Sequence, residues 1–488
     1  MTNSINQKGV YLWKKSGIFN NKNIFLDENE RLNQTYVIGT QNSWKDKTLL
    51  NLMIQDMHNW NWICVIDEYW EYTEQLLKFI PKERAKDIIY FDAGNENRPM
   101  GLNLYEIDSL DEANRVVEYA TEMFLKMFWP EIFWPRIQEY FKYSSLAILE
   151  DFYDKPTILD VVRMFTDNSY KEYKLAKVTN PIVLNRRERT YNTMGDREKG
   201  EIIPYFSSKF VTFQTNKTIR NIIWQTNSAF DLNDAINNKK IVLVNLAKDK
   251  LWELSESLLW TILVYKIKLA LTKRAYLPKE DKNPFFLYIN NFQNILSTPY
   301  WDYLKKAKEN QIWITLIHDY INQLVWIDQI NPRNKEKDIQ DIMNSTWNIC
   351  IFNSFSTDAE LFENELSIPK KAIKNLKENQ FFYINKTDKK PFKINWYNSY
   401  FVNPIETLIP ILKEYSEKKY WRQKDYIEAE FCAKYWINVE IKKINEEGKE
   451  PKIILVRKPE KKEKKEKKEK KEKEHKKISK KKTTKKWA

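Results

Sequence analysis

The chain has 488 residues, of which 42% are hydrophobic and 30% are charged, so length and composition predict a globular protein with room for about three domains. The net charge of +14 comes mainly from residues 457–488, which hold 18 Lys or Arg against 6 Asp or Glu. Because the rest of the chain is close to neutral, the charge does not indicate a globular part with a broad basic surface for nucleic acid.

Cysteine and histidine are scarce, with three of each. Cys64, Cys350 and Cys432 lie far apart in apolar surroundings, so they predict neither a disulfide framework nor a metal site. The sequence has no apolar stretch of the length that a secretion signal or a membrane helix needs. We therefore expect a cytoplasmic protein without a metal centre and without a membrane span.

Glycine and tryptophan occur in unusual proportions, with 8 Gly and 18 Trp. Glycine usually supplies about 7% of a soluble chain, because tight turns and helix ends need its conformational freedom. Trp60 precedes a predicted strand and Trp70 follows it, at turn positions where glycine is common. Two hypotheses are open: the protein is rich in aromatic residues, or its gene uses the UGA codon for glycine and was translated with a code that reads UGA as tryptophan.

In chain order, the first informative stretch is Tyr36–Asp56, YVIGTQNSWKDKTLLNLMIQD, which predicts a strand, a turn at Gly39 and a helix. This is the layout of a phosphate-binding loop, in which glycines let backbone N–H groups face a phosphate and a Lys neutralises it. Measured against G-x-x-x-x-G-K-[ST], Gly39 and Lys45 are in place. Trp44 replaces the second glycine, and Asp46 replaces the hydroxyl residue.

Trp44 would put a bulky side chain where the backbone must approach a phosphate, and Asp46 would add a negative charge beside it. A second register takes Lys47 and Thr48 as the Lys-Thr pair, but it makes the loop two residues too long, so Lys45 is preferred. The strand, turn and helix of an ordinary α/β domain are an alternative interpretation. The candidate nucleotide-binding residues are Gly39, Thr40, Gln41, Asn42, Ser43, Trp44, Lys45, Asp46 and Lys47.

The next segments repeat strands and helices. Trp62–Asp67 is an apolar run that ends in an acid, a helix is predicted at Tyr72–Ile80, and a strand at Ile88–Phe91 closes on Asp92. This alternation predicts a doubly wound α/β fold, with Asp67 and Asp92 at the same edge of the sheet.

We expect five parts in the chain. Residues 1–108 begin the α/β domain with a hairpin and the loop, residues 109–227 form an all-helical insertion, and residues 228–403 complete the α/β domain. Residues 404–456 are predicted to be a peripheral helical segment. Residues 457–488 form a disordered Lys/Glu-rich tail, either a solvated segment or a salt-sensitive contact with nucleic acid or an acidic partner.

Several segments carry a family resemblance. The blocks YVIGT, CVID, FIPKERAKDIIYFDAGNENRPMGLNLYE, KKIVLVNLAK, PFFLYINNFQN and TLIHDYINQL resemble the TraG/TraD-type coupling ATPases of type IV secretion and conjugation, in the HerA/FtsK group of P-loop ATPases. The likeness runs from about Gly9 to Tyr426. It implies a RecA/HerA-like P-loop NTPase core with a mostly parallel sheet and an all-helical insertion, a hexamer, ATP with Mg²⁺ as cofactor, and DNA as partner.

The resemblance also bears on the tryptophans, because nine of them fall where the family pattern has glycine. This favours the hypothesis of a misread codon. The nine are Trp13, Trp44, Trp70, Trp134, Trp224, Trp252, Trp260, Trp347 and Trp421.

The sequence departs from the family at the positions that carry hydrolysis. The resemblance implies an Asp-Glu pair after the strand Phe285–Ile289, with the Asp holding Mg²⁺ through water and the Glu polarising the attacking water. Here these positions are Asn290 and Asn291, neutral amides that can do neither. The His-Gln sensor pair reads His318-Asp319. An alternative is that the two Asn residues are ordinary strand-end residues of another fold.

We therefore expect a hydrolysis-deficient relative of these motors, a pseudo-ATPase with at most weak ATP and Mg²⁺ binding. It would act as a structural or regulatory partner in a DNA-transfer or secretion machine, in a homo- or hetero-hexamer with related subunits. One alternative is an active ATP-dependent DNA translocase whose metal and water are handled by Asp46, Asp67 and Asp319. Another is a nucleic-acid-binding protein that acts through its basic tail.

Overall fold

The computed structural model describes residues 9–15, 22–27, 33–41, 43–128, 135–251, 253–295, 304, 307–327, 335–386, 390–395, 402–434, 439–444 and 452–457. The chain divides into two compact units, Met1–Trp421 and Arg422–Ala488. The predictions for tail residues 458–488, for Asn42, and for Trp134 and Trp252 lie outside the described residues.

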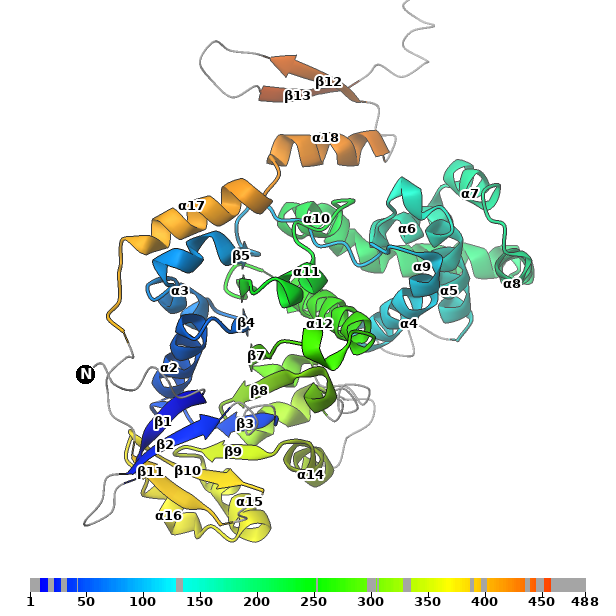
Figure 1. Ribbon diagram of the computed structural model, residues 1–488. Helices are drawn as coiled ribbons and strands as arrows, with labels where there is room; N and C mark the ends of the chain where they lie inside the picture. The colour runs from blue at the N-terminus through cyan, green and yellow to red at the C-terminus, as the bar shows by residue number, and fades with distance from the viewer. Residues whose placement is uncertain are drawn as a thin grey trace, which may run out of the picture. The chain divides into compact units, whose positions relative to one another are not determined.

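The first unit is built on a sheet whose strand order is β2-β1-β11-β10-β9-β3-β8-β7-β4-β6-β5 (Figure 1). All pairs from β9 to β5 are parallel, whereas the pairs from β2 to β9 are antiparallel. This mostly parallel sheet confirms the predicted α/β class. The strands are β1 (Gly9–Lys15), β2 (Lys22–Asp27), β3 (Thr35–Ile38), β4 (Trp62–Asp67), β5 (Ile88–Asp92), β6 (Ile241–Asn245), β7 (Phe285–Asn290), β8 (Ile312–His318), β9 (Asn348–Ile351), β10 (Gln380–Asn385) and β11 (Phe392–Asn395).

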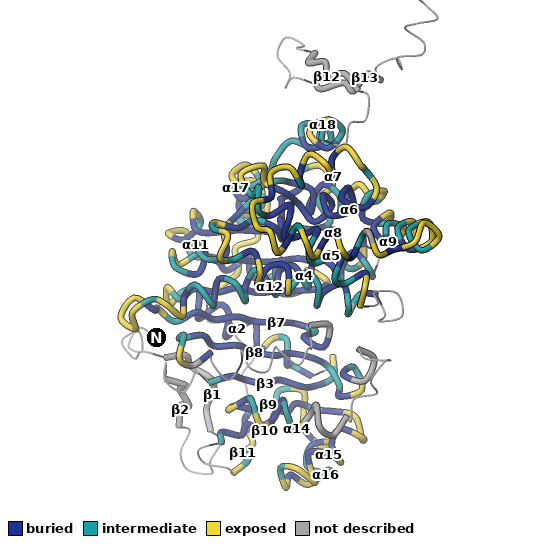
Figure 2. Tube along the Cα trace, turned by 90° about the vertical axis from the view of Figure 1, so that its right-hand side faces the viewer, coloured by how far each residue is buried: buried dark blue, intermediate teal, exposed yellow. Residues whose placement is uncertain are grey.

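The central strands are covered on both faces. Every residue of β3, β4, β6, β7, β8 and β9 is buried, as Figure 2 shows in dark blue for several of them. Helices α2 (Lys45–His58), α3 (Glu71–Leu77) and α17 (Leu408–Tyr420) lie on one side of the sheet, and α11 (Leu232–Asn237) and α12 (Glu253–Ala275) on the other (Figure 1). Nearly continuous apolar runs such as WICVID are what strands in this position require.

Packing of α2 fixes the start of this helix against the sheet. Leu49, Met53 and Met57 recur every four residues, so they share one face of the helix, and all three are buried in one core with Val37 and Ile63. Burying side chains of this size contributes about 1.5–3 kcal/mol each. The first residue of α2, Lys45, is thereby held just beyond the end of β3.

The regular elements described in the segment between β5 and β6 are all helices. Its core is aromatic: the Phe124 and Phe210 ring centroids lie 4.9 Å apart, and those of Phe206 and Phe210 lie 5.0 Å apart. Its helices before α11 are α4 (Leu110–Met127), α5 (Pro135–Leu149), α6 (Ile158–Thr166), α7 (Asn168–Leu175), α8 (Pro181–Asn192), α9 (Asp196–Thr215) and α10 (Lys217–Ile223).

Residues 404–456 differ from the predicted helical segment. Helices α17 and α18 (Lys424–Lys434) are present, but Val439–Ile444 and Lys452–Arg457 form the antiparallel pair β12 and β13. The prediction of helix is wrong for these two stretches. Their sequences, VEIKKI and KIILVR, are rich in β-branched residues, which favour strands when they can pair.

The remaining α-helices of the described part are α14 (Lys335–Ser345), α15 (Ser356–Leu366) and α16 (Lys370–Lys374). Short 3₁₀ helices connect several elements, among them η6 (Ile321–Ile327), which follows β8. None of the described helices combines the length and the apolar character that crossing a membrane would take.

Candidate functional site

A cavity of about 480 Å³ lies beside the carboxyl ends of the central parallel strands. Six of the candidate site residues line it, and they come from the loop after β3, the start of α2, the end of β7 and the residue after β8. Glu68, Tyr69, Trp70, Glu71, Lys248, Gln293 and Gln323 complete the lining around Gln41, Lys45, Asp46, Asn290, Asn291 and Asp319. Ligand sites of α/β proteins typically lie at this edge of the sheet.

The loop from Gly39 to Trp44 is tied to the protein through its own backbone. The N–H of Thr40 donates to the carbonyl of Asn353 at 2.9 Å, and the N–H of Ser43 donates to the carbonyl of Thr40 at 2.9 Å. The N–H of Trp44 donates to the carbonyl of Glu378 at 3.0 Å. A phosphate-binding loop needs such N–H groups for its ligand, and here these three are engaged by carbonyl oxygens.

Gly39 lies where the loop packs closely against the residue after β9, Phe352. A Cβ at this position would overlap the Cβ of Phe352 and lie 3.0 Å from the Ser43 hydroxyl. The glycine is therefore required by packing of the loop against the end of β9, whether or not a phosphate binds.

Lys45 is the most buried cation of the cavity, with 1% of its surface exposed. Its ammonium group forms a short ion pair with the carboxylate of Asp319 and donates to the carbonyl of His318 at 3.4 Å. The pairing follows from the sheet, because β3 and β8 are parallel neighbours with Ile38 opposite His318. Asp319 is thus the next residue beside the loop. The charge that would attract a phosphate is neutralised within the protein.

The residues that follow Lys45 point to other partners. Asp46 accepts a hydrogen bond from the Tyr72 hydroxyl, and the Lys47 ammonium lies 4.5 Å from the centre of the Trp44 ring. The Thr48 hydroxyl donates to the Trp44 carbonyl at 2.9 Å, inside the helix. Neither Lys47 nor Thr48 lines the cavity, so the second register of the motif places no Lys-Thr pair there.

The tryptophans at expected glycine positions differ in backbone conformation. Trp44 has φ −76°, which any residue adopts, so the loop does not require glycine at this position. Trp60 has φ 60° and Trp70 has φ 74°, in the left-handed region that glycine favours. Trp260 is fully buried within α12. Backbone conformation therefore favours glycine over tryptophan at positions 60 and 70.

Asn290 and Asn291 face carboxylates of the neighbouring strand. The Asn290 amide donates to Asp67 at 3.2 Å, and the Asn291 amide donates to Glu68 at 2.9 Å. Strands β7 and β4 are parallel neighbours, which sets the two pairs of residues side by side. Each amide thus satisfies a buried carboxylate and offers a metal only its neutral oxygen. The end of β7 does not fit the acidic Mg²⁺ site of a P-loop motor.

Asp67 has a structural role at the start of α3. It accepts hydrogen bonds from the N–H groups of Tyr72 at 2.8 Å and Thr73 at 3.4 Å. Burial raises the pKa of its carboxyl group, and these hydrogen bonds oppose the shift. Asp92, at the end of β5, accepts from the Asn245 amide at 3.1 Å and does not line the cavity.

The sequence analysis missed a cluster of charges in which Glu68 and Lys248 line the cavity and Glu256 lies behind them. The Lys248 ammonium lies 3.2 Å from Glu68 and 3.8 Å from Glu256, a residue of α12. Burial raises the pKa of Glu68, and burial together with the charge of Glu68 raises the pKa of Glu256 to about 7. One signal was present in the sequence, because Glu68 follows Asp67 directly and gives an Asp-Glu pair at the end of the strand next to β7.

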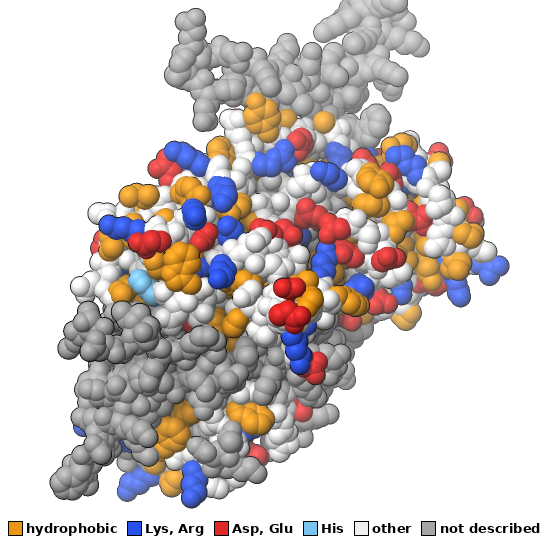
Figure 3. Space-filling view, in the orientation of Figure 1, with side chains coloured by type: hydrophobic (Ala, Val, Ile, Leu, Met, Phe, Trp, Pro, Cys, Tyr) orange, Lys and Arg blue, Asp and Glu red, His pale blue; other side chains and the backbone are white. Residues whose placement is uncertain are grey.

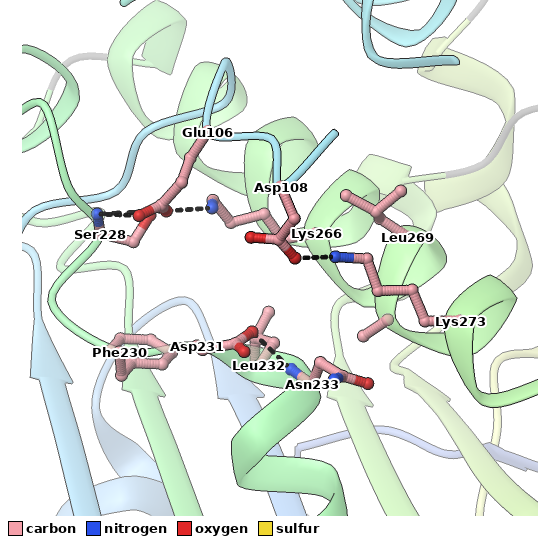
Figure 4. Close-up of a pocket in the computed structure, with 11 residues that line it drawn as sticks. Glu106, Asp108, Ser228, Phe230, Asp231, Leu232, Asn233, Lys266, Leu269 and Lys273 are labelled. Carbon is pink, nitrogen blue, oxygen red and sulfur yellow. Dashed lines mark hydrogen bonds and ion pairs between the residues drawn. The ribbon is translucent and has the colours of Figure 1, made fainter. Parts of the chain in front are cut away.

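A second cavity of about 170 Å³ lies between the segment before α4 and helices α11 and α12 (Figure 4). Its two cations are both paired: Lys266 lies 3.2 Å from Glu106, and Lys273 lies 2.6 Å from Asp108. Asp231 adds a third carboxylate to its wall. The excess of carboxylates makes this cavity a poor site for a phosphate compound.

Comparison with known proteins shows the fold. The structure is similar to the unbound bacterial conjugative coupling protein TrwBΔN70, with a TM-score of 0.55 and 14% identity, covering 78% of this chain and 88% of that one. It is also similar to TrwB in complex with ADP and Mg²⁺, with a TM-score of 0.51 and 14% identity over 77% and 87% of the two chains.

A third similar structure is VirB4 of Thermoanaerobacter pseudethanolicus, with a TM-score of 0.54 and 10% identity, covering 82% of this chain and 98% of that one. No family model matches the sequence, and no curated protein matches it. The chain therefore has the α/β fold of the conjugative coupling proteins, which confirms at the level of the fold its resemblance to the TraG/TraD-type ATPases.

Proposed function

We propose that the protein is a hydrolysis-deficient relative of the coupling ATPases that serves as a structural or regulatory subunit in a DNA-transfer or secretion machine. The observation that carries this proposal is the end of β7, where Asn290 and Asn291 donate hydrogen bonds to Asp67 and Glu68. Amides in this role neither balance a divalent cation nor take a proton from water. Removing one group that stabilises a transition state typically costs about 10²–10³-fold in rate.

Nucleotide binding is proposed to be weak. TrwB has been solved in complex with ADP and Mg²⁺ and with non-hydrolysable GTP and ATP analogues, in a fold that this chain shares. In the present cavity Lys45 is positioned beyond β3 as such a site needs, but it is paired with Asp319. ATP would have to compete with this internal carboxylate, and no acidic site for Mg²⁺ would assist it.

A hexamer with identical or related subunits and contact with DNA are also part of the proposal, from the resemblance to these motors. On the face shown in Figure 3, Lys and Arg side chains are interspersed with Asp and Glu side chains among the described residues. The proposed contact with DNA therefore does not depend on a uniformly basic face of this subunit. We propose that the assembled hexamer makes most of the contact with DNA.

A second candidate function is an active DNA translocase, and one observation favours it. Asp67 and Glu68 form an Asp-Glu pair at the end of β4, one strand away from the expected position, and Glu68 lines the cavity. With Asp46 and Asp319 they could in principle handle a metal and a water molecule. Asp67, however, is engaged by α3, and Glu68 by Lys248 and Asn291.

The test is ATP turnover by the purified full chain, with and without DNA. We expect turnover at the level of background in both conditions. Turnover comparable to that of ordinary DNA motors would contradict the proposed function. Glu74 serves as the control, because its carboxylate does not line the cavity. If such turnover were lost in Glu68→Gln but kept in Glu74→Gln, the second candidate function would be supported.

A further inference from the structure

We propose that Asp319 occupies, within the protein, the place of a phosphate beside Lys45, and that this residue sets the low affinity of the site for nucleotides. The proposal rests on the proposed function and names what controls ligand access to the same cavity. It makes Asp319 a determinant of specificity, since it excludes anionic ligands without filling the cavity.

The first support is the position of the carboxylate. Asp319 directly follows β8, whose last residue His318 pairs with Ile38, the residue before Gly39. It therefore stands beside the first turn of the loop. Its ion pair with Lys45 is short, and the Lys45 ammonium is buried. A phosphate that used this ammonium would have to displace the carboxylate.

The second support is the anchoring of Asp319. The side-chain oxygen of Gln323 accepts hydrogen bonds from the N–H of Asp319 at 2.9 Å and from the N–H of Tyr320 at 3.2 Å. Gln323 belongs to η6, so the turn after β8 is fixed to the helix that follows. The Asp319 side chain is 19% exposed and is held facing Lys45.

The third support is the balance of charge in the cavity. Its lining has two cations, Lys45 and Lys248, and four carboxylates: Asp46, Glu68, Glu71 and Asp319. Burial raises the pKa of Glu71, the nearby charges of Asp67, Asp46 and Asp319 raise it further, and the charge of Lys45 opposes them. A carboxyl group at the rim therefore experiences a negative potential, and a phosphate entering there would experience the same repulsion.

Intramolecular competition has a defined effect on affinity. When only a fraction of molecules has the ammonium available, the apparent dissociation constant rises by the inverse of that fraction. A pair that is closed in about 90–99% of molecules weakens binding by about 10- to 100-fold. Removing the carboxylate also removes one repelling charge. Asp319→Asn keeps the size of the side chain and abolishes both effects.

The experiment measures the affinity of the full chain for a fluorescent ATP analogue. We expect Asp319→Asn to bind it at least about tenfold more tightly than the unmodified chain. Adding Lys45→Ala to that variant should cancel the gain. Glu71→Gln removes the same charge from the rim without touching Lys45, and we expect a much smaller change. Equal gains in Asp319→Asn and Glu71→Gln, or no gain in Asp319→Asn, would overturn the proposal.

A second variant tests the role of Asp319 without changing any charge, in case Asp319→Asn does not fold. Gln323→Ala keeps both charges but releases the turn that holds Asp319, so we expect a smaller gain in affinity in the same direction. No gain in this variant, with an unchanged circular dichroism spectrum, would count against the proposal. ATP turnover is measured on the same samples. High turnover by the unmodified chain refutes the proposed function, whereas an unchanged affinity of Asp319→Asn refutes only the role of Asp319.

Discussion

The side-chain amide of Asn291 donates a hydrogen bond of 2.9 Å to the carboxylate of Glu68, joining the ends of β7 and β4. The carboxylate also accepts from Lys248 at 3.2 Å, so it has a donor on two sides. Glu68 itself is 1% exposed. A buried carboxylate needs such donors, because without them its desolvation is not compensated. The amide of Asn291 thus offsets part of the desolvation cost of burying Glu68, the residue after β4.

Asn291→Asp should destabilise the protein, because it replaces a donor with a second carboxylate against Glu68. We expect a loss of about 1–3 kcal/mol in the free energy of unfolding, measured by urea denaturation at pH 8. Asn238→Asp is the matched control, since the exposed Asn238 also donates to a carboxylate, that of Asp234. Its cost should stay below about 1 kcal/mol, because solvent screens exposed charges. Equal losses would refute the argument from burial.

Glu256 predicts a dependence of stability on pH. The pKa of its carboxyl group is raised from 4.5 to about 7 in the folded protein by burial and by the nearby Glu68. Between these values the folded state keeps a proton that the unfolded state has released, so the free energy of unfolding falls as pH rises. The loss is at most about 3.5 kcal/mol, since the pKa rises from 4.5 to about 7 and one pKa unit corresponds to about 1.4 kcal/mol.

The measurement is thermal or urea unfolding at several pH values from about 4.5 to 8. Glu256→Gln should remove this part of the decline, because an amide cannot ionise. Glu74→Gln, on the other side of the sheet, should leave it in place. A decline that persists unchanged in Glu256→Gln would show that other groups cause it.

Gly39→Ala should destabilise the loop, because the added Cβ would overlap the Cβ of Phe352. We expect a cost of about 1–3 kcal/mol in the free energy of unfolding, the range for overpacking. Gly200→Ala provides the control, since a Cβ at Gly200 in α9 meets no atom within 4 Å. That change should stabilise the protein by about 0.5–1 kcal/mol through the better helix propensity of alanine. A neutral result for Gly39→Ala would mean that the loop can shift away from β9.

Trp70 has φ 74° and is 45% exposed, so Trp70→Gly should relieve strain and lose little buried surface. We expect a gain of about 1 kcal/mol in the free energy of unfolding. Trp347 is similarly exposed at 40%, and its φ is not in the positive range, so Trp347→Gly should destabilise. Mass spectrometry of the native protein gives the direct test. Under the hypothesis of a misread codon, positions 60 and 70 should carry glycine, and tryptophan at both would refute it.

The fold was predictable because its signals are local. The apolar run Trp62–Asp67 and the spacing from Gly39 to Lys45 mark a strand and a loop without reference to the rest of the chain. Parallel pairing of buried strands then follows from the alternation of strands with helices. The strands β12 and β13 were missed because their stability depends on pairing with each other, which a helical reading of residues 404–456 did not consider.

The site was less predictable, because its contacts join distant parts of the chain. The pairs Asn291–Glu68 and Lys45–Asp319 are separated by 223 and 274 residues. Asp319 was singled out as a departure from the family sensor, but its partner depends on the register between β3 and β8. Lys248 ends the block KKIVLVNLAK and Glu256 lies in α12, and neither position carries a known catalytic motif. Only the three-dimensional arrangement brings them close to Glu68.

The hydrogen bonds from Thr40 and Trp44 to the carbonyl groups of Asn353 and Glu378 also restrict the movement of the loop. In a motor, the loop around the nucleotide changes its contacts at each step of the cycle and passes that change to its neighbours. Here hydrogen bonds within the protein hold the loop against the segments that follow β9 and α16. In the ring that the proposed function assigns to this protein, we expect its loop to keep one arrangement while the loops of active subunits change theirs.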